Sequence, residues 1–262
     1  MKTIDIGINL MHRSFNEDRE KVVRDAAAVG VSPLIITGTS ERSSVEAAKY
    51  ASRYPGKLFC TAGVHPHDAK SCTPNTIKKL EELAKQDCVV AIGECGLDYN
   101  RDFSPRDVQR HYFEKQIELA CETGLPLFLH ERDAFDDFYS ILKRYKNEIP
   151  NMVVHCFTGR ERELMAYLEL GCHIGITGWI CDERRGKHLI DLVTKIPINK
   201  LMIETDAPFL TPRNMDEKPI DRRNEPKFLI HILDELAYHL DEDIEELAEK
   251  TYRNTQRFFN IE

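Results

Sequence analysis

Histidines and acidic residues stand at the ends of several short apolar runs in this chain. Glu94 ends the run VVAIGE, His130 ends PLFLH and His155 ends MVVH, while Glu204 and Asp206 follow the run LMI. A charge that ends an apolar run needs a partner, and a metal is one possible partner. Imidazole nitrogens and carboxylate oxygens are ligands for zinc, manganese and iron and, with added waters, for magnesium. The pattern therefore predicts a divalent-metal site.

Such a site would serve hydrolysis. A divalent ion polarises an electrophile and lowers the pKa of a bound water. Asp206 is then a candidate acceptor for the proton of that water, and Glu204, two residues earlier, is a second candidate catalytic residue. Taken singly, each of these residues has a simpler explanation as a hydrogen-bonded histidine or a helix cap. That explanation does not account for several of them at the ends of successive runs.

The apolar runs alternate with helical patterns along the whole chain. Predicted strands are Thr3–Asn9, Leu34–Gly38, Leu58–Val64, Val89–Glu94, Pro126–His130, Met152–His155, His173–Thr177 and Leu201–Thr205. Predicted helices are Asp18–Val29, Arg42–Tyr54, Asn75–Lys85, Pro105–Glu122, Ala134–Lys146, Glu161–Leu170, Glu183–Thr194, Pro226–Tyr238 and Asp243–Phe259. Eight alternations predict the α/β class and a (β/α)₈ TIM barrel, here one domain over residues 1–262, with a doubly wound open sheet as the alternative.

A barrel would bring the strand-end residues together, because the carboxyl ends of its strands meet at one face. Side-chain alternation predicts that Val90, Ile92 and Glu94 share the inward face of their strand, as Val153 and His155 do. The longest polar connection, residues 207–225, follows the eighth strand and is expected at the same face.

Charge and cysteine content set the expected surroundings. The net charge of −8 argues against broad coating of duplex nucleic acid or of acidic membranes. The N-terminus lacks the unbroken apolar core of a signal peptide, and no run is long enough to cross a membrane. Eight cysteines without a CxxC pair are typical of a reduced protein. We expect a soluble, cytoplasmic monomer.

Two arginine pairs lie in loops that follow the last strands, at Arg184–Arg185 and Arg222–Arg223. Guanidinium groups bind phosphate through paired hydrogen bonds, and phosphate sites are frequent at this position in barrels. A solvated surface explains paired arginines equally well, so both interpretations stay open.

Nine motifs, in one order along nearly the whole chain, resemble the TatD family of metal-dependent deoxyribonucleases within the amidohydrolase-like hydrolases. They are DIGINL at Asp5, ITGTS at Ile36, AGVHPHD at Ala62, AIGECGLD at Ala91, HERDA at His130, HCFTG at His155, GITGWICDERRG at Gly175, IETDAP at Ile203 and RRNEP at Arg222. The resemblance implies a TIM barrel and a 3′–5′ exonuclease that acts on single-stranded DNA and RNA ends in DNA repair or turnover.

The resemblance also implies roles for individual residues. Metal ligands would be Glu94, His130 and His155, with Asp206 as a further ligand or the base, and His65 would contact the substrate. We expect the ion to be Mg²⁺, with Mn²⁺ or Zn²⁺ as alternatives. If the arginine loop after the eighth strand does bind phosphates, Arg222 and Arg223 are the substrate-binding residues.

The first strand departs from the wider family. Most members carry an HxH pair there, whereas this chain has Gly7 and Asn9. We therefore expect one firmly bound ion in the free protein and a second only with substrate phosphate. Two other functions remain open: hydrolysis of small amides or esters on the same barrel, and a non-catalytic binding protein.

Overall fold

Eight parallel strands form one sheet in which each strand pairs with its neighbours in sequence order, from β1 to β8. The computed structural model describes residues 1–261. The strands are β1 (Thr3–Ile8), β2 (Val31–Ile36), β3 (Leu58–Ala62), β4 (Val89–Asp98), β5 (Leu127–Arg132), β6 (Met152–Val154), β7 (His173–Ile176) and β8 (Leu201–Ile203). Each predicted strand is confirmed, with shifts of a few residues at the ends.

The sheet closes on itself through β1 and the segment that follows β8. Ile8 forms a parallel bridge with Ala207. The amide of Asp206 donates to the carbonyl of Gly7, and the amide of Asn9 donates to the carbonyl of Ala207, each at 2.8 Å. The TIM barrel is therefore confirmed, and the open doubly wound sheet is excluded by the sequential strand order.

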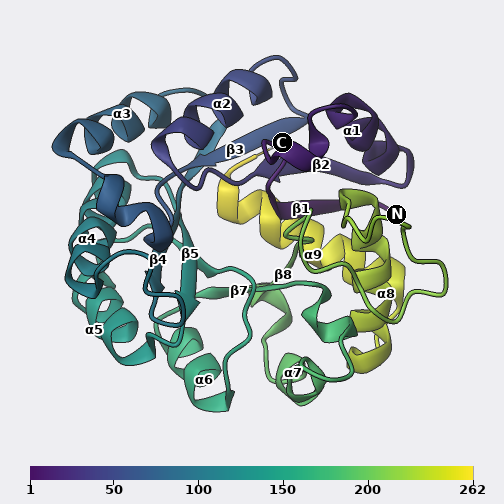
Figure 1. Cartoon of the computed structure of the whole chain (residues 1–262). Helices are drawn as coiled ribbons and strands as arrows, with labels where there is room; N and C mark the ends of the chain where they lie inside the picture. Colours follow the sequence, from purple (N-terminus) through teal and green to yellow (C-terminus); the bar gives the residue numbers. More distant parts are fainter. Residues whose placement is uncertain (262) are drawn as a thin grey trace.

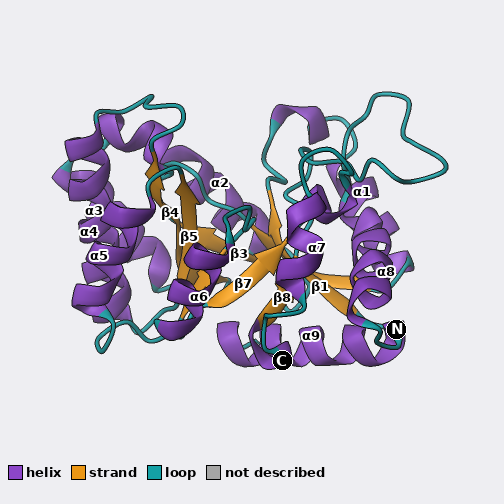
Figure 2. Cartoon of the chain, turned by 90° about the horizontal axis from the view of Figure 1, so that it is seen from below, coloured by secondary structure: helices purple, strands orange, loops and turns teal. Residues whose placement is uncertain are grey.

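Helices surround the strands as an outer ring (Figure 1). They are α1 (Arg19–Ala28), α2 (Glu41–Ala51), α3 (Pro74–Ala84), α4 (Arg106–Thr123), α5 (Phe135–Tyr145), α6 (Glu161–Glu169), α7 (Lys187–Val193), α8 (Leu229–Leu240) and α9 (Ile244–Phe259). The last helix, α9, packs against β1 and β8 and crosses one end of the strands, as Figure 2 shows.

The buried side chains form two clusters. The larger lies between the strands and the helices. The smaller joins residues of several strands to the end of α9: Ile4, Ile6, Ile35, Val90, Phe128, Val153, Met202, Phe258 and Phe259. Because this smaller cluster fills the barrel beside α9, the opposite end, where the strands terminate, is left to polar residues.

The prediction that Ile92 shares the inward face of its strand with Glu94 is wrong. Ile92 belongs to the outer cluster, whereas Val90 belongs to the inner one, so Ile92 does not share the inward face with Glu94. The pairing of β3 with β4 shifts between Val89 and Ala91, and that of β4 with β5 shifts between Gly93 and Cys95, so the two-residue alternation breaks twice along β4. Gly93 has φ +143°, and a Cβ there would lie 2.2 Å from the carbonyl oxygen of Phe128, so only glycine fits.

Candidate metal centre

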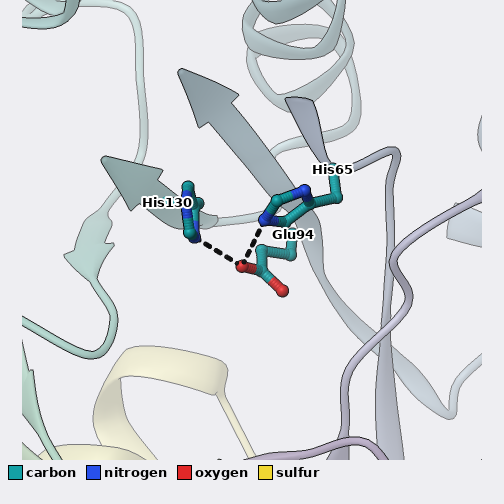
Figure 3. A group of neighbouring side chains, drawn as sticks. All are labelled: His65, Glu94 and His130. Atoms are coloured by element: carbon teal, nitrogen blue, oxygen red, sulfur yellow. Dashed lines mark ion pairs between the residues drawn. The ribbon is translucent and has the colours of Figure 1, made fainter. Parts of the chain in front are cut away.

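Three imidazole nitrogens converge on one carboxylate oxygen at the end of the barrel where the strands terminate. Glu94 Oε1 lies 2.9 Å from His130 Nδ1, 2.8 Å from His155 Nε2 and 3.4 Å from His65 Nε2. Figure 3 shows His65 and His130 directed toward Glu94. Ligand atoms of His65, Glu94 and His130 all lie within 4.8 Å of one another, so this group could hold a metal ion.

The surroundings keep Glu94 charged. Burial alone would raise the pKa of the Glu94 carboxyl, which is 5 % exposed, but the nearby histidines outweigh burial and hold the pKa well below its usual range. Burial and the charge of His130 lower the pKa of His65 to about 3, so its imidazole is neutral; its Nδ1 accepts the amide of His67 at 3.1 Å, which leaves the ring proton on the Nε2 that faces Glu94. One anionic oxygen among imidazole nitrogens fits a divalent cation such as Mn²⁺, Zn²⁺ or Fe²⁺.

Asp98 stands behind His130, on the side away from Glu94. His130 Nε2 lies 3.5 Å from Asp98 Oδ2, and the same oxygen lies 2.7 Å from His67 Nε2. The other oxygen accepts hydrogen bonds from the amides of Asn100 and Arg101. These contacts hold the pKa of Asp98 below its usual range in spite of its burial, which raises it. Within residues 1–261 His130 Nε2 has no hydrogen-bond partner, so Asp98 bonds to His67 and acts on the ring of His130 through its charge, while Nδ1 of His130 faces Glu94.

Glu204 orients the ring of His155 by a hydrogen bond. Glu204 Oε2 lies 3.3 Å from His155 Nδ1, and Oε1 accepts the amide of Cys156. The side chain is completely buried, because two glycines make room for it: a Cβ at Gly7 would lie 2.3 Å from Oε2, and one at Gly175 would lie 2.5 Å from Oε1. Within the described chain Glu204 does not line the cavity, so its effect on a reaction would act through His155.

Asp206 lies at the wall of the cavity and accepts a hydrogen bond from the side chain of Asn9 at 2.9 Å. Confinement away from solvent raises the pKa of Asp206 to about 7; His155 opposes this shift, and the charge of Glu94 adds to it. Asn9, from the first strand, thus contacts Asp206 rather than Glu94 and its histidines.

Two glutamines of α4 fix the loops that carry these side chains. Gln116 Oε1 accepts the amide of Val64 at 2.7 Å, and its Nε2 donates to the carbonyl of the same residue, which precedes His65. Gln109 holds Asp98 in the same manner, accepting its amide and donating to its carbonyl. Sequence reasoning missed both glutamines. It also missed the roles of Asp98 and His67, although the motifs AIGECGLD and AGVHPHD contain them.

An open cavity of about 950 Å³ lies over this group and is lined by residues that follow most of the strands. Arg101, Arg132 and Arg185 line it, are exposed, and form no ion pair within residues 1–261. These three guanidinium groups are available to phosphate at the wall of the cavity, which also carries the acidic side chains of Glu46 and Asp68, in a chain whose net charge is −8.

The predicted phosphate arginines lie elsewhere. Arg223 lies 2.7 Å from Asp18 and 2.8 Å from Glu225, and its guanidinium covers the ring of Phe15. Arg222 is exposed, and within the described residues neither arginine lines the cavity. Of the two predicted arginine pairs, only Arg185 reaches the cavity.

Comparison with known proteins agrees with this geometry. The profile of the family described as TatD related DNase matches residues 4–260. The chain belongs to this family of nucleases. It is 51 % identical to a protein of Rahnella sp. named 3′-5′ ssDNA/RNA exonuclease TatD. The match extends over 257 residues, which are 98 % of this chain and 98 % of the relative. It is 47 % identical to the protein of the same name from Pectobacterium carotovorum, over 98 % of this chain and 99 % of the relative.

Solved structures of TatD proteins share the whole fold. A TatD homologue from Escherichia coli superposes with a TM-score of 0.90 at 28 % identity, covering 99 % of this chain and 98 % of the homologue. A TatD family hydrolase from Entamoeba histolytica gives the same TM-score at 29 % identity, again over 99 % and 98 % of the two chains. The family predicted from the nine motifs is therefore confirmed. In the described part of the chain no helix is long and apolar enough to cross a membrane.

Proposed function

We propose that this TatD nuclease is a divalent-metal-dependent 3′–5′ exonuclease that hydrolyses phosphodiester bonds at the ends of single-stranded DNA and RNA. The observation that carries the proposal is the convergence of His65, His130 and His155 on Glu94 beneath an open cavity. The names of relatives at about half identity over nearly the full chain support the substrate and the polarity.

The residues divide into three roles in this proposal. Glu94, His130 and His155 hold the ion, which would be Mg²⁺, Mn²⁺ or Zn²⁺, with Asp206 as a further ligand or the base. When bound, the ion supplies Lewis-acid polarisation of the phosphate and lowers the pKa of a water. Asp206 accepts the proton of the attacking water from its position at the cavity wall. His65, which also approaches Glu94, faces the same space and contacts the substrate phosphate.

Binding of the strand falls to the rim of the cavity. Arg101 follows β4, Arg132 ends β5 and Arg185 follows β7, and their guanidinium groups are available to bind successive phosphates. These free cations favour a polynucleotide over a small neutral amide or ester, which would have no use for them.

Digestion of end-labelled oligonucleotides tests the proposal. We expect ladders that shorten from the 3′ end when Mg²⁺, Mn²⁺ or Zn²⁺ is present, no cleavage with a chelator, and no cleavage by Glu94→Ala. A matched control is Glu131→Ala, because Glu131 also borders the cavity but bonds to Tyr167 and the amide of Ala134.

Other outcomes would favour the alternatives. Metal-dependent cleavage of a panel of small esters and amides, without cleavage of oligonucleotides, would indicate the small-substrate hydrolase. No turnover of either class would indicate the non-catalytic binding protein. The monomeric state, the cytoplasmic location and the role in DNA repair or turnover stay predictions.

A further inference from the structure

An exposed aromatic ring borders the cavity directly after β8. Phe209 is 49 % exposed and lines the cavity together with His12, whose ring meets it edge-on at 5.5 Å between centroids. A large apolar side chain left half exposed at the wall of a site has a ring face available to a ligand.

The backbone under this ring is held firmly. The amide of Phe209 donates to the carbonyl of Asp206 at 3.0 Å, and the carbonyl of Phe209 accepts the buried side chain of Asn224 at 2.7 Å. The exposed ring therefore stands on a fixed support three residues from Asp206, and little order would be lost when a ligand stacks on it.

A second aromatic ring borders the same cavity from the loop after β7. Trp179 lines the cavity, and the guanidinium of Arg185 lies 5.9 Å from the centre of its ring. The two loops are in close contact, since a Cβ at Gly178 would lie 2.3 Å from the carbonyl oxygen of Leu210, the residue after Phe209. Both rings thus come from one packed pair of loops beside the metal centre.

We propose that Phe209, supported by His12, is a stacking platform for a nucleobase of the bound strand, and that Trp179 with Arg185 receives a neighbouring nucleotide. This inference rests on the proposed nuclease function and names residues that select its substrate. Aromatic rings bind the π-face of any base without reading its sequence. A base inside a duplex has both faces covered by its neighbours, so the platform favours strand ends whose bases are unpaired.

An oligonucleotide that lacks bases isolates the effect. We compare Phe209→Ala with wild type on two substrates: an intact single strand, and a strand of equal length whose terminal segment is abasic. Stacking is worth about 5- to 150-fold per base, so we expect Phe209→Ala to lower kcat/KM on the intact strand by that factor, chiefly through KM. Activity on the abasic strand should be the same in both proteins. Tyr238→Ala, which removes an aromatic ring that is 81 % exposed on α8, is the matched control and should change neither activity.

Equilibrium binding gives a second measurement without turnover. Trp179 is the only tryptophan of the chain, so its fluorescence reports on the cavity directly. In an Asp206→Asn background, the intact strand should quench this fluorescence, and adding Phe209→Ala should weaken the binding by the same factor as KM.

The outcomes separate the two proposals. Equal losses on the intact and abasic strands, or no loss on either, would overturn the platform while leaving the nuclease in place. If wild type cleaves neither strand with any metal, the nuclease function itself fails.

Discussion

Glu204→Gln tests how the buried carboxylates act on the metal centre. Glutamine has the size of glutamate, but it carries one acceptor and one donor in place of two acceptors. Its oxygen must remain with the amide of Cys156, so its NH₂ group faces His155 Nδ1. That nitrogen must then accept, which moves the ring proton to Nε2, the nitrogen directed at Glu94.

The change should therefore appear in metal affinity. A protonated Nε2 offers no lone pair to an ion, so His155 must bind in its unfavoured tautomer or not at all. Loss of such a supporting carboxylate costs about 10- to 100-fold in metal affinity, or ~1.4–2.7 kcal/mol.

Calorimetric titration of the metal-free protein with Mn²⁺ measures the effect. Glu131→Gln is the control, because Glu131 is also hydrogen-bonded at both oxygens but faces no histidine nitrogen in those bonds. An affinity of Glu204→Gln equal to wild type, combined with reduced kcat, would refute the positioning role. It would instead favour the direct catalytic role predicted from the sequence.

Four further changes test other parts of the structure. Asp206→Asn should lower kcat by about 10²–10⁴-fold while Mn²⁺ binding is largely kept, and collapse of that binding would make Asp206 chiefly a ligand. Gly7→Ala should displace Glu204 and weaken Mn²⁺ binding in the same titration, because its Cβ would lie 2.3 Å from Oε2. Burial raises the pKa of Asp5 to about 7, so the folded chain holds a proton there that the unfolded chain loses near pH 4, and the free energy of unfolding should fall from about pH 4 to 7. Asp206, whose pKa is raised to the same value, contributes to the same fall, so Asp5→Asn should reduce its slope in urea titrations without abolishing it. Arg223→Ala should lower the free energy of unfolding by about 1–2 kcal/mol through its lost ion pairs and leave the salt dependence of KM unchanged, whereas a change in KM would restore its predicted role at phosphate.

Local pattern was sufficient to locate every strand and the polar residues that end them. Runs such as MVVH and LMIET can be recognised as strands with polar ends from a few consecutive residues, and barrel geometry then places these ends at one face. The face of Ile92 could not be predicted, because the two-residue period holds only where strand pairing is regular. The pairing shifts between Val89 and Ala91 and between Gly93 and Cys95 depend on the neighbouring strands, as does the close approach of Phe128 that requires glycine at position 93, and no local pattern contains them.

Long-range contacts account for the other differences. Arg223 and Arg185 look alike in sequence, each the second member of an arginine pair in a polar loop. One is held by Asp18, more than 200 positions away along the chain, while the other is left free at the cavity. Gln116 lies in the middle of a helix, where a polar residue predicts a solvated surface, yet it is buried against Val64. Whether a charged side chain forms an ion pair therefore depends on contacts between segments that are distant in the sequence.

The first strand shows why the missing HxH pair does not indicate a degenerate site. The space that a side chain at position 7 would occupy holds the carboxylate of Glu204, and the glycines at 7 and 175 both leave room for it. A histidine at Gly7 and Glu204 in its present place exclude each other. Asn9, the second position of the pair, is bonded to Asp206 and is not free to join Glu94. β1, β7 and β8 are thus arranged around a carboxylate that orients His155, an arrangement that supports one ion held by Glu94 and its histidines. A protein that had lost its metal would have no reason to keep this buried charge in place of an apolar side chain, and for that reason we expect elemental analysis of the free protein to find one firmly bound ion.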